Sequence, residues 1–471
     1  MDKLEYFILC NGKLRKQEAN IDLDKNKIDI DIKNMIKYTI EKFTVFINSF
    51  KDKCIFFYTK DIEKIKYIND EFVIDFFKTP NEKNKREFLK IITNKKKDKW
   101  ISFIFTITYD CNLRCSYCYQ QHDKNLKRKL ITESSLYDIL GVIEKFIEDY
   151  PEWKIDLGLF GGEPLLVENE KIIDIIFEFC KKHRLQIDIT TNGCYLKYYL
   201  KKLIIHRNFI SGINLTVDSS KFNEKTRKSL KHTGCNSGMY ILNYVKLLIE
   251  YGVFVNLSSN MDFDTIKTLE NMYLYLKIND YIDNENFRWS IGRVDDRLYE
   301  TNYPKIISES KLIFEVLKLR EKYNTNKIIP AFIKSTYNLC EILGLNLKQY
   351  ELRGKYNYCW ASSDIDKVYY IDNDLNVFRC TYTVGRYKFS KFLFNKENLY
   401  LDIDKSDSIT YLNYDKCINC EYGGFCSGGC KLSHCNDFKR MCQYEKENLY
   451  EFFNNIFKDK FLEIVGVLDE R

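Results

Sequence analysis

Three cysteines in one short loop are the residues whose types and spacing most directly indicate chemistry. Cys111, Cys115 and Cys118 follow the apolar run of residues 101–107, with three and then two residues between them. Thiolates are soft ligands that favour zinc, copper(I) or iron–sulfur clusters. A closed structural zinc site needs four protein ligands, usually as two pairs, and the next cysteine is only Cys180. Three thiolates around a [4Fe–4S] cluster would leave one iron open to another ligand; the alternative is a set of core or zinc-binding cysteines.

A glycine-rich turn follows the next predicted strand. Residues 155–160 run directly into Gly161-Gly162-Glu163-Pro164. Glycine lets a backbone approach a ligand closely, and a carboxylate accepts hydrogen bonds from an ammonium group. With Tyr117, the aromatic residue before the last cysteine of the loop, these two motifs resemble those of the radical S-adenosylmethionine (SAM) enzymes. The resemblance implies that the three cysteines hold a [4Fe–4S] cluster that binds SAM, and that the turn contacts the amino group of SAM.

The same resemblance implies further cofactor contacts at the ends of the third and fourth predicted strands. Thr191 and Asn192 lie in a Thr-Asn-Gly turn, and Thr216 stands where the family has a serine. Asp218 is expected to hold the ribose hydroxyls of SAM, and Arg227 is expected to pair with its carboxylate. Each of these polar residues can also be read as a cap at a strand end.

A second group of cysteines dominates the C-terminal part of the chain. Its spacing resembles that of the SPASM domain, in which seven cysteines hold auxiliary [4Fe–4S] clusters, and the alternative is one or two zinc knuckles. The resemblance implies that an outer cluster is held by Cys417, Cys420, Cys426 and Cys442. It implies that an inner cluster is held by Cys359, Cys380 and Cys430. The fourth inner ligand is left open between Cys340 and a substrate thiolate, and Cys435 is extra to the pattern.

Two positions depart from the SPASM pattern. Leu375 stands where the family usually has glycine, five residues before the second cysteine. Thr381 stands where the sulfatase-maturing members have an aspartate that serves as a base. The missing base argues against formylglycine formation.

The central region alternates predicted strands with predicted helices, which indicates a parallel sheet with helical crossovers. The strands are expected at residues 101–107, 155–160, 185–189, 209–217, 253–259 and 287–291. We therefore expect an α/β protein with a partial (β/α)6 TIM-type barrel. Parallel α/β proteins place their sites at the carboxyl ends of strands, which is where the three-cysteine loop falls.

Five segments make up the predicted domain organisation. The chain is expected to divide into a small N-terminal α+β module at 1–82, a basic linker at 83–99, the barrel at 100–325, a bridge at 326–358 and the SPASM domain at 359–471. In the first module, residues 6–9 and 54–58 read as strands, and the apolar spacing over 32–50 predicts a helix. In the last, a β-hairpin is expected over 367–380 and a closing helix over 443–457.

Composition excludes several classes of protein. The net charge of +7 is concentrated in residues 83–99, which hold eight Lys and Arg against two acidic residues, so we expect no nucleic-acid binding. No apolar run is long enough for a membrane span, and the N-terminus does not resemble a secretory signal. Seventeen cysteines in such a chain indicate a reduced, cytoplasmic protein with metal or catalytic thiols. Oxygen-sensitive clusters would also fit an anaerobe.

The resemblance implies an enzyme that modifies ribosomally made peptides. We expect reductive cleavage of SAM to a 5′-deoxyadenosyl radical and an oxidative cross-link in a precursor peptide, with a cysteine thioether favoured. Carbon–carbon or carbon–oxygen cross-linking, epimerisation, and a non-catalytic electron-transfer or scaffold role stay open. The expected partners are a precursor with a leader and a cysteine-containing core, and a flavodoxin or ferredoxin. The N-terminal module stands where many such maturases recognise the leader.

Overall fold

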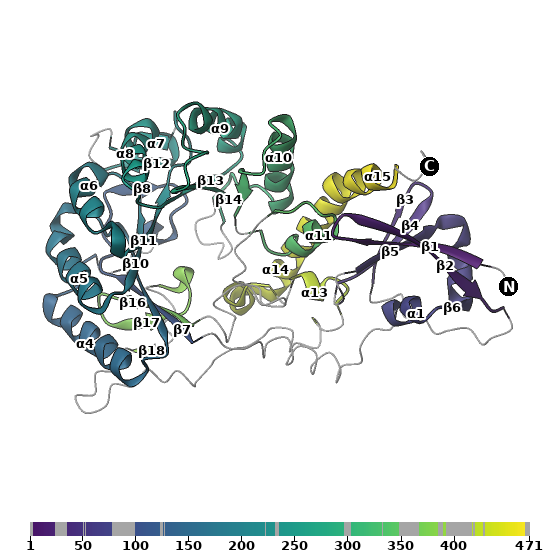
Figure 1. Ribbon diagram of the computed structural model, residues 1–471, viewed down its shortest axis with the longest axis horizontal. Coiled ribbons are helices and arrows are strands. Elements are labelled where there is room, and N and C mark those ends of the chain that lie inside the picture. Colours follow the sequence, from purple (N-terminus) through teal and green to yellow (C-terminus); the bar gives the residue numbers. More distant parts are fainter. Residues whose placement is uncertain are drawn as a thin grey trace.

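Two sheets and a short two-stranded ribbon hold the strands of the residues that the structure describes (Figure 1). The computed structural model describes residues 3–23, 35–49, 51, 53–77, 99–122, 126, 128–221, 223–230, 235–295, 303–331, 333–347, 367–384, 390–391, 417, 420–426 and 429–466. The predicted basic linker therefore lies outside the described residues, apart from Lys99.

The larger sheet has its strands in the order β15-β14-β13-β11-β10-β9-β7-β16-β17-β18. The six strands expected from the sequence are β7 (Trp100–Thr106), β9 (Lys154–Phe160), β10 (Gln186–Thr191), β11 (Ile210–Thr216), β13 (Val255–Met261) and β14 (Phe287–Arg293). All six are parallel to their neighbours in this series, and β14 is followed by the short β15 (Ile329–Pro330). The predicted α/β class with an open, barrel-like parallel sheet is confirmed.

Helices cover the outer side of this curved sheet (Figure 1). They are α4 (Glu133–Asp149), α5 (Glu170–His183), α6 (Leu196–Ile205), α8 (Gly238–Glu250), α9 (Leu269–Ile278) and α10 (Glu309–Lys322). Local signals fix two of their starts, because Thr132 Oγ1 accepts from Ser135 N at 3.1 Å and Ser308 Oγ accepts from Lys311 N at 3.0 Å. None of the helices in the described ranges is long and apolar enough to cross a bilayer.

The C-terminal region contributes three strands to the same sheet. The predicted hairpin consists of β16 (Lys367–Asp372) and β17 (Asn376–Phe378), which pair antiparallel, and β18 (Ser390–Lys391) follows. β16 lies parallel to β7, so it extends the sheet next to the strand that leads into the three-cysteine loop. Leu375, in the hairpin turn, has φ of 63°, the left-handed region that favours glycine. The departure from the family glycine is therefore accommodated by an unusual backbone for leucine.

The N-terminal module is an antiparallel sheet with strand order β3-β4-β5-β1-β2-β6. The strands are β1 (Lys3–Cys10), β2 (Lys13–Ile21), β3 (Ile36–Ile40), β4 (Phe43–Asn48), β5 (Lys53–Tyr58) and β6 (Ile68–Asn69). The helix predicted over residues 32–50 is wrong, because β3 and β4 form a hairpin there with Glu41 at φ 51°. Residues 36–48 are rich in β-branched and aromatic side chains, which fit a strand better than a helix.

Both faces of the N-terminal sheet are covered. One face packs on the 3-10 helix η2 (Thr59–Tyr67) and α1 (Glu71–Phe77). The other face shares a core with α11 (Tyr337–Ile342) and with the C-terminal helices α14 (Lys431–Phe452), η9 (Phe453–Phe457, π-helical) and α15 (Lys458–Gly466). Tyr38 stacks on Phe453 at a centroid distance of 4.4 Å, and Phe43 contacts Phe461 edge-on. Figure 1 shows the purple sheet and the yellow C-terminal helices side by side.

Polar side chains form a hydrogen-bonded ladder on the face of the large sheet away from the helices. On β10, Ile187 and Ile189 are buried in the core and Asp188 between them is half-buried. Ser290 Oγ donates to Asn256 Oδ1 at 2.8 Å, Asn256 Nδ2 donates to Asn214 Oδ1 at 2.9 Å, and Asn214 Nδ2 donates to Asp188. The ladder runs across four neighbouring strands and ends on a carboxylate.

We expect Asp188→Asn to stabilise the protein at neutral pH. Burial raises the pKa of Asp188 to about 6, nearby Asp156 adds to the rise, and the Asn214 amide opposes it. The folded pKa lies above the unfolded value, so the folded state loses stability as the pH rises through about 4 to 6. The substitution removes this cost and should raise the free energy of unfolding by about 2 kcal/mol at pH 7.5 and by roughly half as much at pH 5.

Unfolding midpoints of anaerobic protein at the two pH values measure this gain. The matched control is Asp138→Asn, at an exposed position of α4, which should change stability little at either pH. A gain of equal size at both pH values would contradict the assignment to Asp188 ionisation.

Candidate active site

The three-cysteine loop leaves the carboxyl end of β7 and is clamped by a second segment. Within the loop, β8 (Leu113–Cys115) pairs antiparallel with β12 (Arg227–Ser229). Ser116 N donates to Thr226 O at 2.9 Å, which continues the clamp beyond the strand pair. The pairing brings Arg227, 112 positions after Cys115 in the chain, to the backbone of that cysteine.

The thiols of the loop lie in a buried environment. Cys111 is buried, and Cys115 and Cys118 are half-buried. Burial raises the pKa of Cys111 to about 12 and of Cys115 to about 11, and the charge of Arg227 opposes the rise at Cys115. Leu113 N donates to Cys111 Sγ at 3.4 Å, and Asn192 Nδ2 lies 3.7 Å from the same sulfur. Positive charge from a bound iron cluster is what such thiols need in order to ionise.

The chain between residues 3 and 466, in the ranges described, contains no group of three or more His, Cys, Asp or Glu placed to hold a single metal ion. A four-iron cluster distributes its thiolate ligands over separate iron atoms and so spaces them more widely.

The glycine-rich turn after β9 lies directly against this loop. Gly162 N donates to Thr108 O at 2.9 Å and Glu163 N donates to Asp110 O at 2.8 Å. Gly161 has φ of 137°, and a Cβ on Gly162 would lie 2.0 Å from Asp110 O. Only glycine allows the two backbones to approach this closely. The two motifs that resemble a known family in sequence are therefore joined in space.

Glu163 is held rigidly at the centre of the site. Its carboxylate accepts from Leu165 N at 2.8 Å, Thr191 Oγ1 at 2.7 Å and Asn192 N at 2.6 Å. Burial raises the pKa of Glu163 to about 7, and these three donors oppose the rise. Pro164 contributes its carbonyl, which accepts from Asn169 Nδ2 at 3.0 Å. Two predicted cofactor residues at the end of the third predicted strand, Thr191 and Asn192, therefore both donate to the carboxylate of Glu163, which follows the second.

Asp218 and Arg227 are joined through the hydroxyl of Tyr117. The Tyr117 hydroxyl donates to Asp218 Oδ2 at 2.7 Å and accepts from Arg227 Nη1 at 2.9 Å. Asp218 is fully buried and also accepts from Thr226 Oγ1 and Asn260 N. The ribose contact of Asp218 stays a prediction, and the observed contacts give this carboxylate an internal role. Thr216, the last residue of β11, is half-buried.

Two asparagines of the site were not predicted from the sequence. Asn112 Oδ1 accepts from Asn192 Nδ2 at 2.8 Å and thereby ties the loop to the third strand. Asn260, at the carboxyl end of β13, supplies a backbone donor to Asp218 at 3.0 Å. The only available signals were the position of Asn112 beside a cysteine and of Asn260 at a strand end.

Comparison with known families identifies the central domain. Residues 105–276 match the description "Radical SAM superfamily", and this range includes the loop, the turn and every predicted SAM-contact residue. The chain carries a radical SAM domain. Such domains take SAM and a [4Fe–4S] cluster, and the two relatives described next are enzymes.

The similarity to relatives in sequence extends beyond this domain, over about two thirds of the chain. The "Cysteine-type anaerobic sulfatase-maturating enzyme" of Clostridium novyi is 25% identical over 340 residues, which are 68% of this chain and 85% of the relative. "Radical SAM cyclopropyl synthase TigE" of Paramaledivibacter caminithermalis is 27% identical over 349 residues, 69% of this chain and 66% of the relative.

Solved structures share the fold. "Native anSMEcpe with bound AdoMet" has a TM-score of 0.56 at 18% identity, covering 78% of this chain and 100% of that one. SuiB of Streptococcus suis bound to precursor peptide SuiA has a TM-score of 0.54 at 14% identity, covering 86% of this chain and 96% of that one. At these identities the likeness is one of fold.

The C-terminal cysteines form a second group beyond the radical SAM domain. The thiol of Cys426 lies within electrostatic range of the other three predicted outer ligands, which are Cys417, Cys420 and Cys442. Cys430 stands at the N-cap position of α14 and makes no side-chain capping bond there. Cys380 lies near Tyr119, whose hydroxyl donates to Thr381 O at 2.5 Å, so the end of β17 faces the radical SAM loop.

Three other cysteines bear on the predicted inner cluster. Cys340 is fully buried in the core shared with the N-terminal sheet, near Glu309 and Arg320, which is the environment of a structural thiol. Cys359 lies outside the described residues, and of Cys435 only the backbone in α14 is described.

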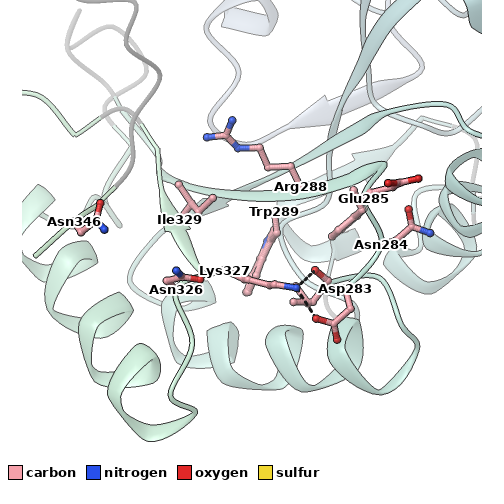
Figure 2. A pocket seen from close by; sticks show the side chains of 11 residues that line it. Asp283, Asn284, Glu285, Arg288, Trp289, Asn326, Lys327, Ile329 and Asn346 are labelled. Carbon is pink, nitrogen blue, oxygen red and sulfur yellow. Dashed lines mark hydrogen bonds and ion pairs between the residues drawn. The ribbon is translucent and has the colours of Figure 1, made fainter.

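A pocket of about 340 Å³ lies at the opposite edge of the sheet, at the start of β14 (Figure 2). Lys327 crosses it and pairs with Asp283 at 2.6 Å, beside the buried ring of Trp289. Because it lies at the amino ends of the strands, away from the cysteine loop, we give it no part in the chemistry.

Proposed function

We propose that this protein is a radical SAM peptide maturase. The joining of the three-cysteine loop to the glycine turn by hydrogen bonds of 2.8 and 2.9 Å carries the proposal. The donor set fits the cofactors: three thiols for the cluster, a glycine cradle, and the buried Nε of Arg227, which finds no partner among the described residues. When bound, the cluster and SAM supply a 5′-deoxyadenosyl radical that abstracts hydrogen from an unactivated carbon.

The residues of the chain bind and orient in this scheme. Cys111, Cys115 and Cys118 hold the cluster, Glu163 accepts from the amino group of SAM, and Arg227 pairs with its carboxylate. Buried placement of these groups excludes water from the reacting centre and fixes the geometry. The decisive experiment is to incubate anaerobically reconstituted protein with SAM and dithionite and to measure 5′-deoxyadenosine. A non-catalytic electron carrier would form none.

A peptide is the substrate class that the relatives support. One relative is a sulfatase-maturating enzyme, and two structural neighbours are complexes with peptides, anSMEcpe with Cp18Cys and SuiB with SuiA. We propose a ribosomally made precursor with a cysteine-containing core, a flavodoxin or ferredoxin as electron donor, and a cytoplasmic location.

Among the possible products we favour a cysteine thioether, with two auxiliary clusters as electron acceptors. Thr381 occupies the place of the aspartate base of sulfatase maturation, and Cys380 beside it lies near the radical SAM loop through Tyr119. Closing the C–S bond removes a hydrogen atom from carbon and a proton and an electron from the thiol. Mass spectrometry of a co-expressed precursor should therefore show a loss of two hydrogens and one alkylation-resistant cysteine. A mass loss with every cysteine reactive would favour carbon–carbon or carbon–oxygen cross-linking, and an unchanged mass would favour epimerisation.

Edge strand β3 is the proposed leader-binding element. In the part of the chain that the structure describes, β3 pairs with β4 alone. Strand β2 carries four charged residues among its nine, which disfavour strand addition, whereas β3 reads Ile-Lys-Tyr-Thr-Ile with one charge. An extended leader could add to β3 as a further strand.

We expect Thr39→Pro to weaken leader binding by about tenfold or more. Ile40 and Phe43 are the hydrogen-bonded pair that closes the two-residue hairpin. Because hydrogen-bonded and non-hydrogen-bonded pairs alternate along an antiparallel ladder, the backbone N–H of the exposed Thr39 points away from β4. Proline there removes an outward N–H and leaves the β3–β4 ladder in place. Fluorescence anisotropy with a labelled leader measures the effect, and Thr39→Ala, which keeps the N–H, is the control. Equal affinities of the two variants would remove β3 from the proposal.

A further inference from the structure

A chain of three side chains connects three segments of the cofactor site. Arg227 begins β12, Asp218 follows β11, and Tyr117 stands in the three-cysteine loop. The tyrosine hydroxyl lies 2.9 Å from Arg227 Nη1 and 2.7 Å from Asp218 Oδ2. Asp218 is 0% exposed and Arg227 is 6% exposed. A buried carboxylate and a buried guanidinium are thus held apart by one neutral hydroxyl.

The direction of each hydrogen bond in this chain is fixed. A guanidinium has donors only, so Arg227 donates to the tyrosine oxygen and the hydroxyl proton is left for Asp218. Asp218 is further fixed by Thr226 Oγ1 at 2.9 Å and by Asn260 N at 3.0 Å. The arrangement holds the guanidinium through Nη1 alone. The Nε of Arg227 is buried and has no partner among the described residues, so it can still donate.

Without the hydroxyl, the two buried charges would attract each other directly. Opposite charges in a poorly solvated site interact strongly, and an unpaired buried charge is costly. Arg227 would then turn toward Asp218 and its donors would be used inside the protein.

We propose that Tyr117 is a positioning residue for SAM: its hydroxyl separates Arg227 from Asp218, so that the guanidinium stays available to the SAM carboxylate. This inference rests on the proposed function. It assigns to the aromatic residue of the loop a role that needs the hydroxyl and not only the ring.

The test is the affinity for SAM of anaerobically reconstituted protein, measured by isothermal titration calorimetry. Tyr117→Phe should raise the Kd by about tenfold to a hundredfold, because a charged donor loses its alignment. The variant should keep the wild-type iron content. Asp218→Asn removes the competing charge, so the double variant should bind SAM more tightly than Tyr117→Phe alone.

A structural loss is distinguished by a matched control. Tyr281→Phe also removes a buried tyrosine hydroxyl, which donates to Leu242 O at 2.9 Å far from the loop, and should lower Tm without changing the Kd. A Tyr117→Phe variant that binds SAM like the wild type would overturn the inference alone. So would a double variant that binds more weakly than Tyr117→Phe. Failure of the wild-type protein to bind SAM would overturn the proposed function instead.

Discussion

Gly162→Ala is expected to abolish SAM cleavage and to lower the free energy of unfolding by about 3 kcal/mol or more. The added Cβ would lie 2.0 Å from Asp110 O and 2.6 Å from Tyr109 O. Both contacts are with backbone atoms, so no side chain can move away to relieve them. The turn and the cysteine loop must separate, and the bond from Glu163 N to Asp110 O is lost. Formation of 5′-deoxyadenosine and the urea unfolding midpoint measure the two effects.

The matched control is Gly141→Ala. Gly141 lies within α4, and a Cβ there would meet nothing within 4 Å. Alanine should raise stability by about 0.5–1 kcal/mol through its higher helix propensity and leave SAM cleavage unchanged. Wild-type activity in Gly162→Ala would mean that the loop and the turn do not need their close contact.

Cys115→Ala is expected to reduce SAM cleavage to background. The resemblance assigns three thiolates to one four-iron cluster, so the variant should lose about four iron atoms per chain and retain the remaining iron. Iron analysis and electron paramagnetic resonance of the reduced protein with and without SAM provide the measurement. The SAM-dependent change of the signal should disappear.

Cys180→Ala is the control for the loss of a cysteine as such. Cys180 is fully buried in α5, within the core of the large sheet. Its replacement should cost about 1 kcal/mol of stability and leave both iron content and SAM cleavage intact. Retention of SAM cleavage by Cys115→Ala would refute the assignment of the cluster to this loop.

Local patterns predicted the central sheet well because its signals are local. Each strand is a short apolar run followed by a helix with an apolar face, and caps such as Thr132 mark where helices begin. The helix predicted over residues 32–50 failed because apolar residues of a buried hairpin can coincide with helical spacing. The turn at Glu41 and Lys42 carries no glycine or asparagine to reveal it.

The site was only partly predictable for a different reason. The motifs indicated Cys111 and Glu163, and the family resemblance implied a role for Arg227, but the order of residues does not say which donors reach a buried oxygen. The sequence did not indicate that Asp218 contacts Tyr117 and Asn260, about a hundred and about forty positions away. These hydrogen-bond partners depend on which strands lie side by side in the sheet and in what register. A short sequence motif does not contain that information.

Contacts between segments far apart in the chain constrain how the protein is made. The N-terminal sheet leaves the ribosome before the large one and packs one apolar face on α15, which ends at Gly466, and β7 gains its neighbour β16 only after residue 367. Nascent chains therefore emerge with uncovered hydrophobic surface and unpaired strand edges, a condition that favours chaperone binding. These early segments should therefore complete their packing only after the last hundred or so residues have been synthesised.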